Sequence, residues 1–177
     1  MAIIKEDIFK AKAIEQIAYE MCLAARTAPK TKGIDLIETA VVTGDDIKKL
    51  VSKMEEIFKQ SGREAFGRNA ESVKDASAIV VIGVKSKTAG LKPCSICGFK
   101  DCAENEAKGA ICSYNSIDLG IAVSSALSKA ADSRLDNRTM WTIGMAAKDL
   151  GILGQEVKQV LGIPLSATGK NIFFDRR

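Results

Sequence analysis

Four of the five cysteines lie close together, in the segment CSICGFKDCAENEAKGAIC. Their spacing is Cys94-x2-Cys97-x4-Cys102-x9-Cys112. Two cysteines separated by two residues can direct both sulfur atoms to one centre if the backbone turns sharply between them. Gly98 frees the backbone to make that turn, and Pro93 restricts the approach to it. The chain is therefore expected to fold so that these thiols act together.

Several uses of such thiols compete. The N-terminal segment MAIIKEDIFKAKAIEQ is interrupted by charges too often for a signal peptide, so we expect a cytoplasmic protein with reduced thiols. This disfavours disulfides. Chance is also a poor explanation, because polar residues and glycines surround the cysteines, whereas free cysteines usually pack as small apolar residues. Cys22 fits that last description, since it lies on the apolar side of the first expected helix.

Metal binding is the remaining interpretation, and it has two forms. Zinc sites usually combine two C-x2-C pairs that are distant in the sequence, whereas here one pair is followed by two single cysteines. An uneven series of this kind better suits a [4Fe–4S] cluster, in which each iron needs one thiolate. We therefore expect an iron–sulfur centre, with structural zinc as the alternative.

Composition limits the other possibilities. The chain has 177 residues, of which 46% are hydrophobic, and this suits one domain over residues 1–177 with 92–113 as an inserted cysteine-rich, metal-binding segment. The net charge of +4 is spread along the chain, so we expect no nucleic-acid partner. No stretch approaches the roughly 20 apolar residues that span a membrane. Because histidine is absent, no Ser–His–Asp or Cys–His set is possible, and catalytic residues stay unassigned.

The hydrophobic pattern predicts alternating helices and strands. Helices are expected over 5–27, 45–60, 63–76 and 116–134, and strands over 36–43 and 77–84. The second strand is apolar throughout, as a strand buried on both faces requires. Further on, we expect a helix within 139–153, a short helix over 154–164 that ends at Pro164, and a closing strand over 170–175. This order indicates an α/β (α+β) fold with a central sheet flanked by helices.

The cysteine segment also resembles a known pattern. It is similar to the C-x2-C-G-[FY]-x2-C sequence, followed by a later cysteine, of the small [4Fe–4S] domain in corrinoid iron–sulfur proteins and electron-transport subunits. This resemblance implies cluster ligands at Cys94, Cys97, Cys102 and Cys112. The last spacing is shorter here than in many of those domains, which makes Cys112 the ligand that departs most from the pattern.

Nearly the whole chain resembles an uncharacterised prokaryotic family of ferredoxin-domain-containing proteins. The segments that carry this resemblance are AARTAPKTKGID, the cysteine segment, DLGIAVSSAL, DNRTMWTIG and GIPLSATGKNIFFDR. The resemblance implies a redox role and indicates almost nothing about a substrate.

Two segments also resemble the flavin-dependent nitroreductase fold. They are AARTAPKTKGIDLIETAVVT and DLGIAVSSALSKAADSRLD. The resemblance implies a mixed sheet flanked by helices, FMN as a second cofactor, and a homodimer in which the second segment packs across the interface. The small residues of that segment suit close helix contact: Gly120, Ala122, Ser124, Ser125 and Ala126.

The chain departs from nitroreductases where those enzymes bind flavin. Lys30 and Gly33 occupy the turn in which they have a serine and an asparagine, and their N-terminal arginine-rich segment is missing. No flavin-binding residue is therefore assigned. Lys30, Lys32 and Lys170 could neutralise a flavin phosphate, but exposed loop lysines are the simpler interpretation.

We therefore expect an iron–sulfur protein that exchanges electrons with a redox partner protein or a small-molecule acceptor. Lys92, Lys100 and Lys108 flank the cysteines and should stabilise the more negative, reduced cluster. A flavin-dependent oxidoreductase coupled to the cluster and a zinc-stabilised interaction domain without catalysis are the alternatives.

Overall fold

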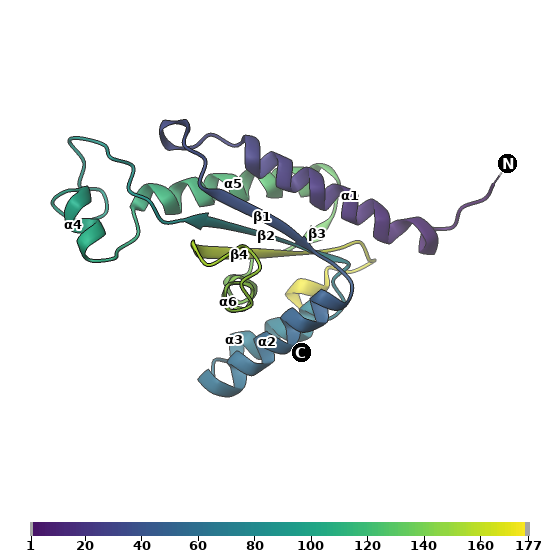
Figure 1. Cartoon of the computed structure of the whole chain (residues 1–177). Coiled ribbons are helices and arrows are strands. Elements are labelled where there is room, and N and C mark those ends of the chain that lie inside the picture. The colour runs from purple at the N-terminus through teal and green to yellow at the C-terminus, as the bar shows by residue number, and fades with distance from the viewer. Residues whose placement is uncertain (1, 176–177) are drawn as a thin grey trace.

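Strand β2, Ala78–Lys85, forms the centre of the molecule in the computed structural model, which describes residues 2–175 (Figure 1). Its side chains alternate between two hydrophobic cores, one on each face of the sheet. Val80 and Ile82 belong to the first core, whereas Ile79 and Val81 belong to the second. The predicted strand buried on both faces is confirmed.

The sheet has four strands in the order β1-β2-β4-β3, and neighbouring strands all pair antiparallel. The outer strands are β1, Ile37–Val42, and β3, Asp136–Asn137, and the fourth is β4, Val157–Ser166. Helices cover both faces. The predicted class, a central sheet flanked by helices, is confirmed.

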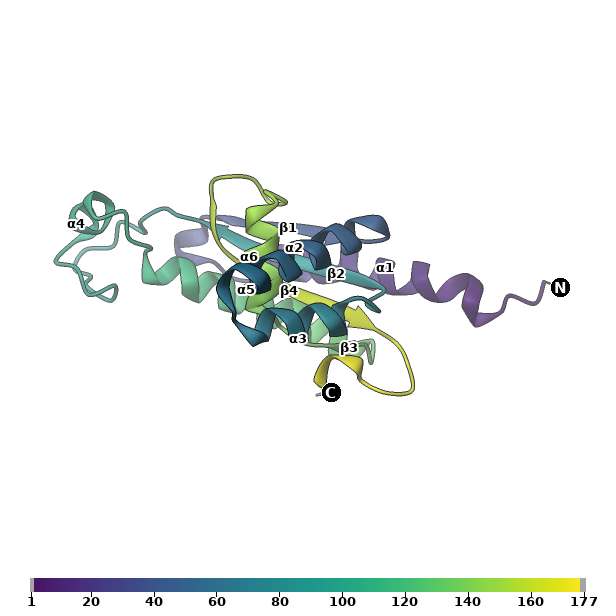
Figure 2. The ribbon, with the colours of Figure 1, turned by 90° about the horizontal axis from the view of Figure 1, so that it is seen from below.

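Two long helices cover the first core. They are α1, Glu6–Thr27, and α5, Ser113–Asp132, which lie side by side over one face of the sheet (Figures 1 and 2). The small residues of α5 allow this close packing, and its Ser125 hydroxyl donates to the Ala24 carbonyl oxygen over 2.8 Å. Within the described residues, no helix is long and apolar enough to cross a lipid bilayer.

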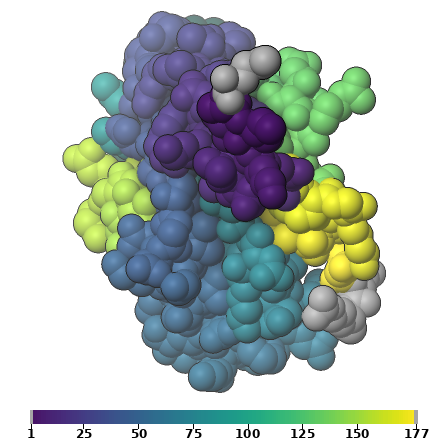
Figure 3. Space-filling model, turned by 90° about the vertical axis from the view of Figure 1, so that its right-hand side faces the viewer, coloured from purple at the N-terminus to yellow at the C-terminus, as the bar shows by residue number. Residues whose placement is uncertain are grey.

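Three shorter helices cover the second core. They are α2, Asp45–Ser61; α3, Glu64–Val73; and α6, Trp141–Asp149. Figure 3 shows α2 and α3 from the end of the molecule where α1 begins and the C-terminal segment lies. Helix α6 crosses β4 so closely that a Cβ atom on Gly144 would lie 1.8 Å from the Val160 carbonyl oxygen. Only glycine fits at that position.

Two predictions for the C-terminal part are wrong. Residues 154–164 contain most of β4 rather than a helix, and Pro164 pairs with Ile79 inside the sheet. Proline is tolerated there because the antiparallel ladder turns its missing N–H away from β2. The expected strand over 170–175 is instead a short 3₁₀ helix, η2, Ile172–Phe174, which Asn171 caps by accepting from the Phe173 N–H over 3.1 Å.

Candidate metal centre

The cysteine segment extends beyond the end of the sheet as an arm, residues 86–112, between β2 and α5 (Figure 1). Its regular element is the short helix α4, Cys102–Ala107. The arm carries all four cysteines that the spacing singled out.

The first two cysteines lie on a tight turn. Gly98 has a φ of +82°, a conformation that favours glycine, and its N–H donates to the Ser95 carbonyl oxygen over 2.9 Å. The Ser95 hydroxyl donates to the Cys94 carbonyl oxygen over 2.8 Å. The turn predicted at Gly98 is therefore present, and it places Cys94 and Cys97 on one short loop.

The third cysteine begins α4. Asp101 caps this helix by accepting a hydrogen bond from the Glu104 N–H over 2.9 Å, and the Glu104 carboxylate accepts from the Lys100 N–H over 2.8 Å. This reciprocal pair fixes the start of the helix. Cys102 is the residue directly after the cap, so its position follows from the capping residues on either side.

The fourth cysteine lies where the chain leaves the arm. Cys112 is the N-terminal flanking residue of α5 and is 7% exposed. The N-terminus of a long helix carries a partial positive charge, and Cys112 lies at that end of α5. Cys112 is therefore the most buried of the four cysteines and the one attached to the main body of the protein.

Asn105 joins the last two cysteines. Its backbone carbonyl accepts from the Ala110 N–H over 3.0 Å, and its side-chain Nδ2 donates to the Ile111 carbonyl oxygen over 3.4 Å. Asn105 is 1% exposed, and its Oδ1 atom has no hydrogen-bond partner among the described residues. The hydrogen bonds hold the segment before Cys112 against the helix that begins at Cys102.

All four cysteines line one hollow in the arm, which we call the cysteine hollow. Asn105 and Tyr114 also line it. Its free volume is about 10 Å³, room for one water molecule. A cluster therefore fits only if the loop at 94–98 moves outward. That loop is exposed, with Ile96 59% accessible.

The thiols share a hollow but do not converge on a single point. Within residues 2–175, no three Cys, Asp or Glu side chains are arranged to hold a metal ion. Tetrahedral zinc would require sulfur atoms about 3.8 Å apart, since each Zn–S bond is about 2.3 Å long. Ligands of an iron–sulfur cluster stand further apart, because each binds a different iron. The uneven spacing of the four cysteines, one C-x2-C pair followed by two single cysteines, favours the larger group.

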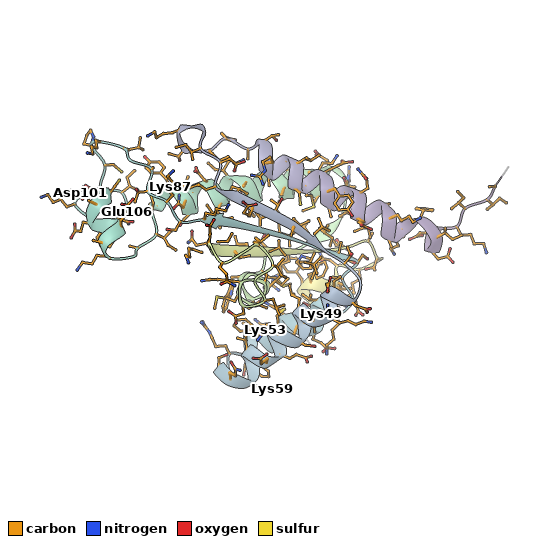
Figure 4. The ribbon with its side chains drawn as sticks, viewed as in Figure 1. Lys49, Lys53, Lys59, Lys87, Asp101 and Glu106 are labelled. Carbon is orange, nitrogen blue, oxygen red and sulfur yellow. The ribbon has the colours of Figure 1, made fainter. Side chains whose placement is uncertain are left out.

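The arm is rich in cations without ion-pair partners. Exposed lysines occur along its length, at Lys87, Lys92, Lys100 and Lys108. None of them forms an ion pair with another described residue. Its carboxylates instead accept hydrogen bonds inside the arm, as Glu106 does from the Thr88 hydroxyl. Figure 4 shows Lys87, Asp101 and Glu106 together on the arm.

The base of the arm is tied to α5. The Lys87 N–H donates to the Asn115 Oδ1 over 3.1 Å, so a buried amide of α5 holds the first part of the arm. One helical turn further along α5, the buried Asp118 accepts from the N–H and the hydroxyl of Thr31 over 3.1 and 2.9 Å. Neither role was predicted from the sequence.

The three lysines considered for a flavin phosphate are engaged elsewhere. Lys30 Nζ donates to the carbonyl oxygens of Ala25 and Arg26 at the end of α1, and burial lowers its pKa. Lys32 Nζ donates to the Ala89 carbonyl oxygen over 3.3 Å, and Lys170 pairs with Asp175 over 2.7 Å. The simpler interpretation, loop lysines with local roles, fits these contacts.

The comparison with other sequences identifies the family. Residues 108–176 match the family model described as "Uncharacterized protein containing a ferredoxin domain (DUF2148)". An uncharacterized protein from Archaeoglobus fulgidus is 42% identical over 98% of this chain and 97% of its own length. The chain belongs to this ferredoxin-domain family. The matched range includes Cys112 but begins after the other three cysteines of the arm.

Solved structures share the fold of this ferredoxin-domain protein. A nitroreductase with bound FMN from Bacteroides fragilis matches with a TM-score of 0.62 and 12% identity, over 87% of this chain and 77% of that one. Nitroreductase A from Vibrio parahaemolyticus matches with a TM-score of 0.54 and 14% identity, over 89% of this chain but only 59% of that one. At these identities the likeness shows the nitroreductase fold alone.

Proposed function

We propose that this ferredoxin-domain protein holds a [4Fe–4S] cluster through Cys94, Cys97, Cys102 and Cys112 and transfers single electrons. The observation that carries the proposal is that all four side chains line one hollow. A bound cluster would supply one-electron chemistry that no amino-acid side chain here provides. The segment 92–113 is then an inserted metal-binding part of a single nitroreductase-like domain, residues 1–177.

The chain's own residues contribute in three ways. The four cysteines supply thiolates, and Cys112 lies at the positive end of α5. The unpaired lysines of the arm favour the more negative, reduced state. Asn105 and Asn115 hold the two ends of the arm in place. Zinc remains the competing occupant, and the uneven spacing of the cysteines supports the cluster instead.

A second candidate function adds a flavin. The Bacteroides fragilis structure with the same fold holds FMN, and this favours a flavin-dependent oxidoreductase in which the cluster exchanges electrons with FMN. Such an enzyme would act as a homodimer in the cytoplasm, with a redox protein or small molecule as its partner. No residue of this chain is assigned to the flavin.

One anaerobic preparation distinguishes these functions. Iron, acid-labile sulfide, zinc and flavin are measured per chain on the same sample. We expect about four irons and about four sulfides, with a broad visible absorbance band. One zinc per chain without sulfide would overturn the proposal in favour of a structural domain. Flavin that copurifies together with iron would support the coupled oxidoreductase.

A further inference from the structure

A groove of about 400 Å³ lies along the edge of β4, between α5 and α6. Such a volume is typical of small-molecule sites, which range from about 300 to 1,000 Å³. Side chains from three elements line it, and the residues that matter here are Gly120, Trp141, Met145, Lys148, Lys158 and Leu161. None of these residues belongs to the cysteine hollow.

The groove exists because β3 is short. Strand β3 pairs only with Leu165 and Ser166, and Met140 bridges to Gly162, so among the described residues no strand covers β4 before that point. Gly162 directs its N–H and carbonyl toward Met140 over 3.1 and 2.8 Å. Residues two apart in an antiparallel strand point the same way, so the Val160 N–H is directed away from β2, toward the open edge of β4.

The walls of the groove are mostly apolar. Trp141 is 41% exposed and Met145 is 45% exposed on α6. Across the groove, α5 presents Gly120, where a Cβ atom would find nothing within 4 Å. The groove therefore has open space beside an aromatic ring on which a planar ring system can pack.

The charged side chains that line the groove are all positive among the described residues. Lys148 and Lys158 both line it, and none of the described Asp or Glu side chains does. Lys158 Nζ donates to the Gln155 carbonyl oxygen over 3.3 Å and keeps donor capacity for a ligand, because an ammonium group has three N–H bonds. Two cations beside an apolar slot complement a molecule that carries a flat ring and a negative group.

We propose that this groove binds a small planar organic anion. The groove also lies near the cysteines along α5. Ser116 and Gly120 line it and follow Cys112 by four and eight residues, which correspond to about 6 and 12 Å along a helix. If the proposed cluster is present, the ligand is its electron partner, and this part of the inference rests on the proposed function.

A quinone that carries an anionic group is one ligand of this class, and the cluster could reduce it. Two reduced clusters lose one electron each, and the quinone gains these two electrons and two protons from water to become a hydroquinone. A flavin nucleotide shares the required chemistry, a flat ring with an anionic group. Separate arms of the experiment therefore distinguish the two sources.

Trp141 makes the binding measurable, because it is the chain's single tryptophan and lines the groove. Anthraquinone-2,6-disulfonate and FMN are each titrated against the protein while tryptophan fluorescence is recorded. We expect saturable quenching by at least one of them. The double variant K148A/K158A should weaken binding about tenfold, since each exposed charge pair contributes up to about 1 kcal/mol. The variant K12A removes an exposed lysine of α1, outside the groove, and should bind like the wild type.

The outcomes separate this inference from the proposed function. Absence of saturable quenching by both compounds up to about 1 mM would overturn the groove as a binding site. Equal affinity in K148A/K158A and wild type would overturn the role of the lysines. Both tests apply even if the protein contains no iron. With iron present, stopped-flow oxidation of the dithionite-reduced cluster by the bound compound should slow about tenfold in K148A/K158A at subsaturating concentration.

Discussion

The side-chain amide of Asn105 donates to the carbonyl oxygen of Ile111 over 3.4 Å, and this contact joins α4 to the residue before Cys112. Because α4 begins at Cys102, one buried amide sets the distance between the third and fourth cysteines. Asn105 lines the cysteine hollow, where its Oδ1 atom has no partner. The arm is therefore held together in part by a residue other than the four cysteines.

Replacing this amide should weaken metal binding without removing a ligand. We predict that Asn105→Ala lowers the affinity for the cluster at least about tenfold, as is usual when a group that orients metal ligands is lost. Iron retained per chain after anaerobic dialysis against a chelator measures the effect. Asn171→Ala removes a similar side chain-to-backbone hydrogen bond outside the arm and serves as the control. Equal iron retention in the two variants would show that Asn105 has no positioning role.

The lysines of the arm should influence the reduction potential. We predict that the triple variant K92Q/K100Q/K108Q has a more negative midpoint potential, because these cations stabilise the extra electron on the reduced cluster. A redox titration followed by electron paramagnetic resonance measures it. Lys59→Gln on α2, far from the arm in Figure 4, is the control. A potential that stays constant or becomes more positive would contradict the electrostatic role.

The local hydrophobic pattern of the sequence predicted most of the long helices and strands, but it did not predict β4. The predicted helices at 5–27 and 45–60 match α1 and α2 closely, because each buries a face with helical spacing. In β4, Val157, Val160 and Leu161 recur at intervals of three and one residues and imitate a helix. The strand forms because this segment pairs with β2 along its length, which is a contact between distant parts of the chain.

The sequence indicated the four cysteines that line the hollow but not the residues that position them. The cysteine spacing indicated the four thiols, whereas the roles of Asn105 and Asn115 were missed. A signal for them exists in the sequence. Each asparagine follows a cysteine by three residues, and residues three apart lie on the same face of a helix. Their hydrogen bonds reach loops whose course no local pattern specifies, so their partners could not have been predicted.

The crossing of α6 over β4 gives a sharp test of the fold. We predict that Gly144→Ala lowers the free energy of unfolding by at least about 3 kcal/mol, because its Cβ atom would lie 1.8 Å from the Val160 carbonyl oxygen. Gly120→Ala in α5 has open space around the new methyl group and should raise stability by about 0.5–1 kcal/mol. Urea unfolding measures both. A similar effect for the two variants would contradict the close crossing.

Stability should also depend on pH through Asp35. Burial alone raises the pKa of this carboxyl, but the hydrogen bond from Arg26 at 2.6 Å and that from the Ile37 N–H outweigh burial and hold the pKa below its ordinary value of 3.8. A lowered folded-state pKa means stability that is present above pH 3.8 and is lost as the pH falls through the folded-state pKa. We predict that Asp35→Asn destabilises by about 1 kcal/mol or less at neutral pH, because the pair is partly exposed, and that the difference shrinks below pH 3.8. Urea unfolding of the wild type and of Asp35→Asn, at neutral pH and below pH 3.8, measures this difference. A difference in the free energy of unfolding that is as large at low pH as at neutral pH would contradict the prediction.

The central claim is that the four cysteines of the arm bind one cluster together, and Cys112 is the decisive position. Iron and acid-labile sulfide are measured per chain in anaerobic wild type, Cys112→Ala and Cys22→Ala, with circular dichroism to confirm folding. Cys22 is partly buried against the first core and outside the arm, so its removal is the matched control. We predict about four irons and four sulfides in the wild type and in Cys22→Ala, and loss of most of the iron in Cys112→Ala. Full iron and sulfide in a folded Cys112→Ala variant would contradict the claim.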